Sequence, residues 1–259
     1  GTRWYHWQAP NLINYFQSPL NTQLHEGSEP VPNATLINEA QDVHIPVAAG
    51  RSYLFHIINM GAFAAQYVQF DQHKMTVVEI DGVYTKPYEV TQIFLTAAQR
   101  CSVIVRAKPD SKQNFAIVAS MNEDMFDTSV IPPGLKNTVT GWLVYDKKKP
   151  LPKPFDLQYL LETQDDTVFV PLDGMKALGP VTVPIPLTVK FNTSDQGQNR
   201  GYFNDVSYVP QKVPTLYTAL SAPPSLANNP KIYSKYSNPN VVPMGAIVEL
   251  TIINTDGKP

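Results

Sequence analysis

Side chains that could bind a metal ion or act as a catalytic base are few in this sequence, and they are scattered. The five histidines show neither His-x-His nor His-x3-His spacing; they are His6, His25, His44, His56 and His73. The sequence also lacks a glycine-rich phosphate loop, a nucleophile elbow and a His-Glu-x-x-His motif. We therefore expect each histidine to have a structural role, at the surface, in a strand or in a hydrogen-bonded turn.

The single cysteine, Cys101, restricts the chemistry further. One cysteine excludes an internal disulfide and a cysteine-rich zinc site. Residues around Cys101 alternate between apolar and polar types, as in a half-buried strand. Because a free cysteine usually packs as a small apolar residue, we expect a buried, inert thiol here. A metal ligand or an intermolecular bridge is the alternative.

Two Asn-x-Ser/Thr sequons begin at Asn33 and Asn192, and both are candidate glycosylation sites. Only 16% of the residues are charged, and 24 are prolines. Together with the sequons, this composition favours a secreted glycoprotein, or one on the extracellular face of the cell surface.

The charge and hydropathy patterns exclude two classes of partner. The formal net charge is −2 and no extended basic patch occurs, so nothing marks a nucleic-acid-binding surface. No apolar run reaches the roughly 18 residues needed to span a bilayer. We expect no nucleic-acid partner and no membrane span in this chain.

Short segments rich in β-branched and aromatic residues recur along the chain, separated by turn residues. Asp81-Gly82 lies between two of them and is typical of a tight reversal. Strands at this spacing predict an all-β sandwich or barrel. The predicted strands are 52–59, 74–80, 92–96, 101–105, 115–119, 140–145, 185–191, 202–204 and 246–253.

The composition divides the chain near residue 150. Three consecutive lysines and three prolines between 147 and 154 are typical of a semi-extended linker. We predict one domain over 1–150, a linker over 151–182 and a second strand-rich domain over 183–259. A Greek-key sandwich needs about 100 residues, so the second domain is expected to be incomplete. Both ends of the chain, Gly1 and Pro259, look cut.

Several motifs resemble the fungal multicopper oxidases in order and spacing. Four segments resemble the second domain of that family: 27–32, 57–63, 73–83 and 96–100. Three more resemble the opening of its third domain: 202–208, 212–216 and 247–257. Residues 4–6 resemble the junction between the first and second domains. The resemblance implies cupredoxin-like Greek-key sandwiches, one complete and one partial.

The same resemblance implies where copper binds. The family's copper ligands are His-x-His pairs, a His-Pro-x-His-x-His segment and a His-Cys-His segment, and none of these occurs here. Copper in the parent enzyme would therefore be bound outside this chain, by the missing first-domain and third-domain segments of the same protein. We expect the chain alone to bind no copper and to be inactive.

Among these oxidases, the chain most resembles the ferroxidases of iron uptake. Matched to that group's iron site, the candidate residues are Glu29, Asp127 and Asp256, which would bind ferrous iron and admit its electron. Hard carboxylate oxygens suit a hard cation and favour the ferric product. The parent enzyme would couple this oxidation to the four-electron reduction of dioxygen to water. Near Asp127, the neighbouring carboxylates of Glu123 and Asp124 leave its assignment open.

Two alternatives remain. Laccase-like members of the family place an acid near the Glu29 position, where it accepts a phenol proton, so the substrate could be a phenol or a pigment precursor. The chain could instead be a metal-free cupredoxin-like module that acts in binding or in structure.

Overall fold

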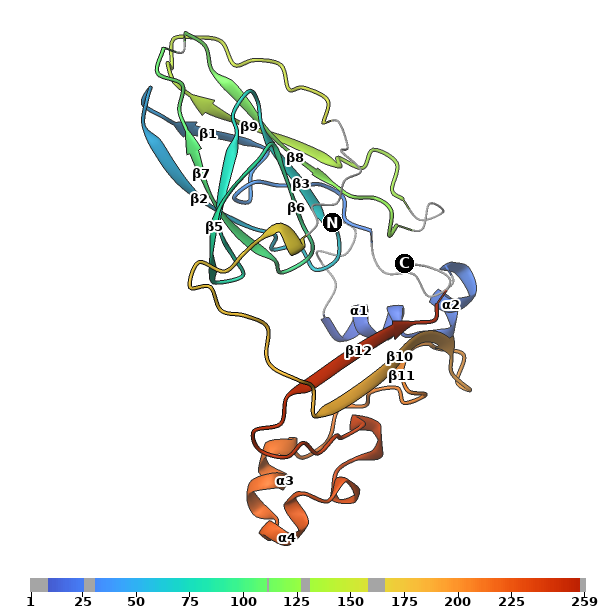
Figure 1. Cartoon of the computed structure of the whole chain (residues 1–259). Helices are drawn as coiled ribbons and strands as arrows, with labels where there is room; N and C mark the ends of the chain where they lie inside the picture. Colours follow the sequence, from blue (N-terminus) through green and yellow to red (C-terminus); the bar gives the residue numbers. More distant parts are fainter. Residues whose placement is uncertain (1–8, 26–30, 111, 127–130, 158–165, 257–259) are drawn as a thin grey trace. The chain divides into compact units, whose positions relative to one another are not determined.

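The computed structural model describes residues 9–25, 31–110, 112–126, 131–157 and 166–256 (Figure 1). The chain divides into two compact units. The first unit consists of Gly1–His6 and Pro30–Met175, and the second unit of Trp7–Glu29 and Lys176–Pro259. Since each unit takes two separate stretches of sequence, no single boundary separates them.

The strands of the first unit form two sheets. A five-stranded sheet has the order β1-β9-β8-β3-β6, and a four-stranded sheet has the order β2-β7-β4-β5. Neighbouring strands are antiparallel, except that the first and last strands, β1 and β9, pair in parallel. The strands are β1 (Asp42–Pro46), β2 (Ser52–Ile58), β3 (Gln66–Phe70), β4 (Met75–Ile80), β5 (Val83–Val90), β6 (Gln92–Leu95), β7 (Arg100–Arg106), β8 (Phe115–Met121) and β9 (Thr138–Val144).

The hairpin of β4 and β5 shows how local sequence sets the geometry. Ile80 pairs with Val83, which leaves Asp81 and Gly82 as a two-residue loop. Both loop residues have positive φ angles, 50° and 87°. A two-residue hairpin turn of this kind matches the twist of its strands, and aspartate followed by glycine adopts it readily. The predicted reversal is confirmed.

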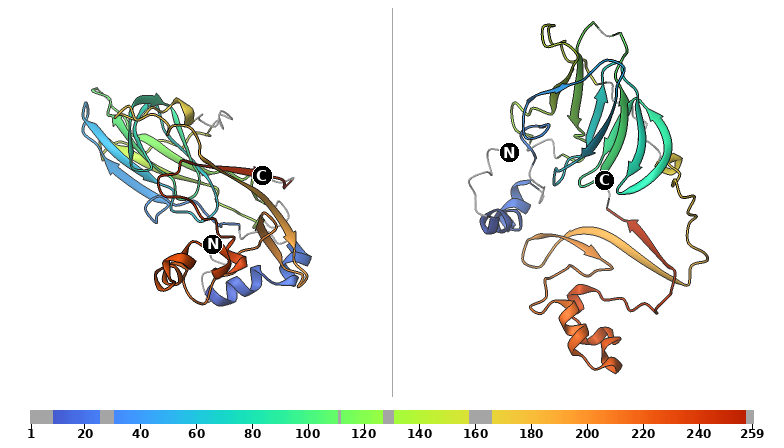
Figure 2. Two further views of the ribbon diagram at one scale, coloured as in Figure 1. Left: turned by 60° about the horizontal axis from the view of Figure 1, so that its bottom comes forward. Right: turned by 90° about the vertical axis from the view of Figure 1, so that its left-hand side faces the viewer.

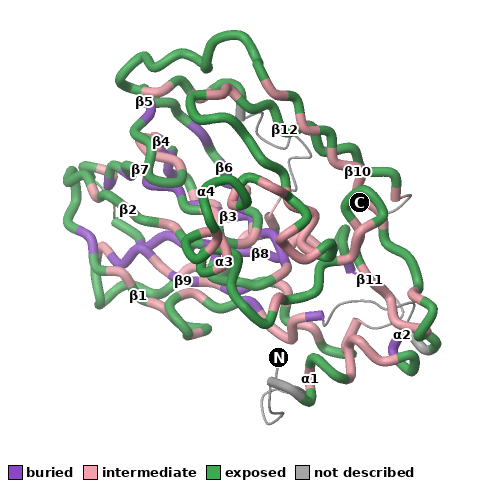
Figure 3. Tube along the Cα trace, turned by 90° about the horizontal axis from the view of Figure 1, so that it is seen from below, coloured by how far each residue is buried: buried purple, intermediate pink, exposed green. Residues whose placement is uncertain are grey.

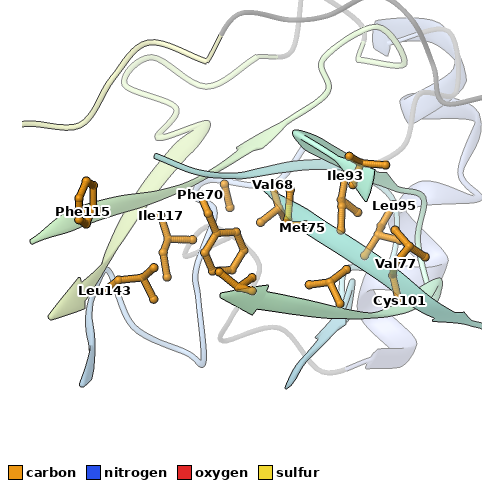
Figure 4. Packing of buried hydrophobic residues seen from close by; sticks show 14 of the residues in the cluster. Val68, Phe70, Met75, Val77, Ile93, Leu95, Cys101, Phe115, Ile117 and Leu143 are labelled. Atoms are coloured by element: carbon orange, nitrogen blue, oxygen red, sulfur yellow. The ribbon is translucent and has the colours of Figure 1, made fainter. Parts of the chain in front are cut away.

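The core of the first unit fills the space between its two sheets. Every residue of β8 is buried (Figure 3). The fully buried side chains include Met75, Val77, Val103 and Phe115, which come from both sheets. Figure 4 shows Met75, Val77 and Phe115 within this core. A smaller cluster contains Val31, Ala64, Met121 and Phe126.

The lysine- and proline-rich segment after β9 is fastened to the first unit. The Asn114 side chain, 1% exposed, accepts hydrogen bonds from the Tyr145 and Asp146 amides and donates to the Lys149 carbonyl (3.1 Å). The Trp142 indole N–H donates to the Pro152 carbonyl (3.2 Å). Buried polar side chains nearly always have hydrogen-bond partners, and residues of this segment are the partners of Asn114.

Residues farther along also belong to the first unit. After a short 3-10 turn, η2 (Asp166–Val168), Phe169 packs against the core. The Lys86 amide donates to the Val170 carbonyl and the Leu172 amide to the Tyr84 carbonyl, both at 2.8 Å. These bonds cover the edge of β5. The last of the junctions between the units therefore falls after Met175, inside the predicted linker 151–182, because long-range hydrogen bonds hold the residues before it in the first unit.

The second unit contains a three-stranded sheet in the order β11-β10-β12. β10 pairs with β11 in an antiparallel hairpin and with β12 in parallel, so β10 and β12 run side by side (Figures 1 and 2). Its elements are α1 (Ala9–Phe16), α2 (Pro19–His25), β10 (Val183–Thr193), β11 (Asn199–Phe203), α3 (Thr215–Ser221), α4 (Pro224–Ala227), η3 (Pro230–Ile232), η4 (Lys235–Ser237) and β12 (Val248–Asn254).

Two prolines lie in the central strand β10 without breaking it. The Thr188 amide faces away from β12 and donates to the Asn204 side chain (2.8 Å). Backbone amides point alternately to the two sides of a strand, so the nitrogens of Pro184 and Pro186 face the same side of β10 as the Thr188 amide. On that side β11 pairs with β10 only from Val189 onward. Proline is tolerated where a strand has no neighbour to receive its amide.

The second unit differs from the first in burial. None of its described hydrophobic side chains is buried, and every residue of β12 is exposed.

In the described part of the chain, no helix has the length and apolar character that crossing a membrane requires.

Candidate functional site

Of the three predicted iron carboxylates, Asp256 is the one whose surroundings can be described. Glu29 and Asp127 lie outside the described residues. Asp256 lies two residues after the end of β12 and is partly buried.

Asp256 is held by the end of strand β10. The ladder between β10 and β12 ends at the pair Val189 and Asn254, so β10 continues past its neighbour. The Phe191 amide donates to Oδ2 of Asp256 (3.0 Å), and the Asp256 amide donates to Oδ1 of Asn254 (2.9 Å). The carboxylate thus takes the place that a backbone carbonyl would have in a longer strand. A carboxylate fixed in this way presents a preorganised negative charge.

The loop before Asp127 is anchored by a buried aromatic side chain. Phe126 is 6% exposed and stacks on Phe63, with ring centroids 5.9 Å apart. Val31, near the predicted Glu29, lies in the same buried cluster as Phe126. The structure therefore brings together two described segments that neighbour the predicted acids.

Glu123 and Asp124, the neighbouring acids that left the assignment open, are engaged within their own loop. The Asn137 side-chain amide donates to Oε1 of Glu123 (2.6 Å). The Asn122 side chain donates to Oδ2 of Asp124 (3.0 Å) and accepts from the Asp124 amide (2.9 Å). Both carboxylates accept hydrogen bonds that stabilise the loop between β8 and β9.

The three histidines with described side chains each have a protein partner. His44 Nε2 lies 2.8 Å from an oxygen of Asp42. His73 is buried, with Nδ1 2.6 Å from the Asp71 carbonyl and Nε2 2.7 Å from the Tyr145 hydroxyl. Burial lowers the pKa of His73, because the charged imidazolium would lose its hydration. His73 thus has the structural role expected of it.

A hydrogen-bonded chain across three strands was not foreseen from the sequence. His56 Nδ1 lies 2.8 Å from Oγ of buried Ser102, whose hydroxyl donates to Glu79. Glu79 reaches this face because a register shift interrupts β4 after Val77. Serine, and not histidine, is the middle member, so the arrangement is not that of a hydrolytic triad.

Cys101 is 4% exposed on β7, as predicted. Burial, with the negative charges of Glu79 and Asp81, raises its thiol pKa to about 12. Copper sites of the His2Cys type bind a thiolate, the form this environment disfavours. Within the described part of the chain, no three His, Cys, Asp or Glu side chains are grouped so as to hold a metal ion. The described residues therefore do not fit a copper centre.

The two sequons have different surroundings. Asn192 is exposed near the end of β10. Asn33 is partly buried, and the Thr35 hydroxyl of its sequon is buried and donates to the Asn137 carbonyl (2.7 Å).

Comparison with known proteins gives a consistent result. The iron transport multicopper oxidase FET3 of Gibberella zeae is 44% identical over 255 residues, which are 98% of this chain and 40% of that protein. The iron transport multicopper oxidase fetC of Epichloe festucae is 40% identical over 253 residues, with the same two shares. The chain thus spans about two-fifths of the length of these curated relatives.

A solved structure confirms the fold. The crystal structure of Fet3p, a multicopper oxidase that functions in iron import, matches with a TM-score of 0.91 and 33% identity, over 98% of this chain and 47% of that one. The prediction of an all-β, cupredoxin-like fold is confirmed. The sequence model of the multicopper oxidases matches residues 2–148, more than half of the chain. This chain belongs to the multicopper oxidase family.

Proposed function

We propose that the chain is part of a secreted or cell-surface ferroxidase, which oxidises ferrous iron and reduces dioxygen to water. The observation that carries this proposal is the similarity to iron transport oxidases along 98% of the chain. Four one-electron oxidations of iron supply the electrons that convert one dioxygen and four protons into two waters. Copper would be bound by other parts of the protein.

In this proposal, Glu29, Asp127 and Asp256 bind the iron. Three carboxylates stabilise the ferric product more than the ferrous substrate, which lowers the potential for electron loss. The anchored geometry of Asp256 supports its role, because a ligand held by hydrogen bonds needs little reorganisation when the cation enters. Burial of Val31 and Phe126 in one cluster supports a shared site for the two segments they fix.

We further propose that the second unit is the opening part of another cupredoxin-like domain. A three-stranded sheet needs a covered apolar face to be stable, and here the described hydrophobic residues remain unburied. Leu250 and Ile252 of β12, for example, are 55% and 60% exposed. Further strands of the same protein would cover such residues.

Steady-state kinetics of the complete oxidase test the iron site. The variants are Glu29→Ala, Asp127→Ala and Asp256→Asn; asparagine keeps an oxygen for the Phe191 amide while the charge is lost. A charge-assisted contact contributes roughly 1.5–3 kcal/mol, so each variant should lower kcat/KM for ferrous iron by about 10- to 150-fold. Asp127→Ala should show the smallest effect.

A bulky organic reductant is the control substrate, because its electrons need no carboxylate cage. Its turnover should be unchanged in all three variants. If iron kinetics stayed normal while phenol oxidation collapsed in Glu29→Ala, the laccase-like activity would replace the ferroxidase. If the complete protein had no oxidase activity and bound no copper, the result would instead support the alternative of a binding or structural module.

A further inference from the structure

The last residues of β12 are fastened to β10 by more than the regular ladder. The Val189 carbonyl accepts two hydrogen bonds from Thr255, one from its amide (3.0 Å) and one from its hydroxyl (2.9 Å). Thr255 lies between Asn254 and Asp256. The residue that separates these two polar side chains is therefore fixed in place on the neighbouring strand.

Asn254 closes a turn around this fixed residue. Its Oδ1 accepts the Asp256 amide at 2.9 Å, in the pattern by which asparagine side chains mimic a backbone turn two residues on. The carboxylate of Asp256 then meets the Phe191 amide at 3.0 Å. Backbone and side chain of Asp256 are thus held from different directions, the backbone by Asn254 and the side chain by β10.

We infer that Asn254 is a positioning residue for the carboxylate of Asp256. It binds no substrate itself; it sets the backbone from which the Asp256 side chain reaches β10. This inference rests on the proposed function, in which Asp256 binds iron. Residues that orient a metal-binding carboxylate typically change metal affinity or activity 10- to 100-fold when they are replaced.

The chain provides a matched control on the other side of β10. Asn204 is also exposed, and its Oδ1 also accepts a β10 amide, that of Thr188, at 2.8 Å. It also donates to the Pro186 carbonyl (3.1 Å). Replacing Asn204 weakens the same strand through the same kind of contact but leaves in place the hydrogen bonds that join Asp256 to Phe191 and to Asn254.

The test compares four variants of the complete oxidase: Asn254→Ala, Asn254→Ser, Asn204→Ala and Asp256→Asn. Asn254→Ala should raise KM for ferrous iron about 10-fold, while kcat and KM for an organic reductant stay at wild-type values. Asn254→Ser keeps a side-chain oxygen that can accept the Asp256 amide and should restore most of the affinity for iron. Asn204→Ala should leave KM for iron unchanged even if Tm falls.

The outcomes separate this inference from the proposed function. If Asp256→Asn impairs iron oxidation but Asn254→Ala does not, Asp256 acts without help from Asn254 and the inference is wrong. An equal rise in KM for Asn204→Ala and Asn254→Ala would also overturn it, because strand stability would then explain both. If Asp256→Asn itself leaves iron kinetics unchanged, the proposed iron site fails, and the positioning role fails with it.

Discussion

Replacing Asn114 with alanine should release the lysine- and proline-rich segment that follows β9. The Asn114 side chain makes five hydrogen bonds to backbone groups of residues 145–150. The Asn114 amide nitrogen has two N–H groups but makes three of these contacts, so it contributes about two full hydrogen bonds. With the two bonds that its oxygen accepts, the side chain contributes about four hydrogen bonds in total. Because residues 146–150 are exposed and can bind water once freed, we use the lower part of the range of about 0.5–1.5 kcal/mol per bond. The segment should lose about 3 kcal/mol.

That loss has a measurable consequence for proteolysis. A change of about 3 kcal/mol raises the population of the open segment about 150-fold. When opening and closing are fast, cleavage follows that population. Trypsin should therefore cut after Lys147 and Lys148 up to about 150 times faster in Asn114→Ala under native conditions. Mass spectrometry of the early products identifies the cleaved bonds.

Two controls show whether the opening is local. Asn122→Ala removes an asparagine whose side chain donates to Tyr67 of β3 and to Asp124, and not to residues 145–150, so it should not change the rate at Lys147. Cleavage after Lys136 should stay slow in Asn114→Ala, since faster cutting there would indicate general unfolding. The reasoning is refuted if Asn114→Ala leaves the rate at Lys147 and Lys148 within about threefold of the wild type.

Three further predictions concern titration, reactivity and modification. Burial lowers the pKa of His73 in the folded protein, so the unfolded chain takes up a proton first as the pH falls below about 6.5, and the folded state loses stability there. His73→Gln should therefore show a smaller drop in Tm between pH 7.5 and pH 5 than the wild type. An unchanged drop would contradict this prediction. Cys101, with a thiol pKa of about 12, should resist iodoacetamide at pH 8 until the protein is unfolded, and stoichiometric labelling of the native protein would disprove its burial. Asn33→Gln and Asn192→Gln should each lower the mass of protein secreted by a fungal host by one N-linked glycan; an unchanged mass would show that the sequon is unused.

The sequence predicted the elements whose signal is local. The alternation of 52–59 corresponds to β2, where exposed and half-buried residues alternate, and Asp81-Gly82 forms the expected turn. By contrast, the lysines and prolines after residue 146 have the composition of a linker. These residues are held against the first unit because the Asn114 side chain forms hydrogen bonds with them in the folded protein. No local sequence pattern predicts such a distant partner.

The candidate site shows the same division. Asp256 is predicted by the resemblance to the ferroxidases, and the spacing of Asn254 and Asp256 is a local turn signal that could have pointed to their hydrogen bond. The Phe191 contact depends on how β10 and β12 align across 65 residues of sequence. The chain from His56 through Ser102 to Glu79 depends on a register shift in β4. The register between two strands is set by tertiary packing, and the sequence of either strand alone does not predict it.

The parallel pairing of β1 with β9 has a consequence for the order in which the protein folds. The Thr35 hydroxyl, in the segment before β1, donates to the Asn137 carbonyl, next to β9, and these two residues are 102 positions apart in the chain. At about 5–20 residues per second, the ribosome needs roughly 5–20 s to deliver β9 after β1 has emerged. During that interval β1 has no partner strand, and the five-stranded sheet is open at β8. Synthesis, and not the search for contacts, would then set the earliest moment at which the sandwich can close.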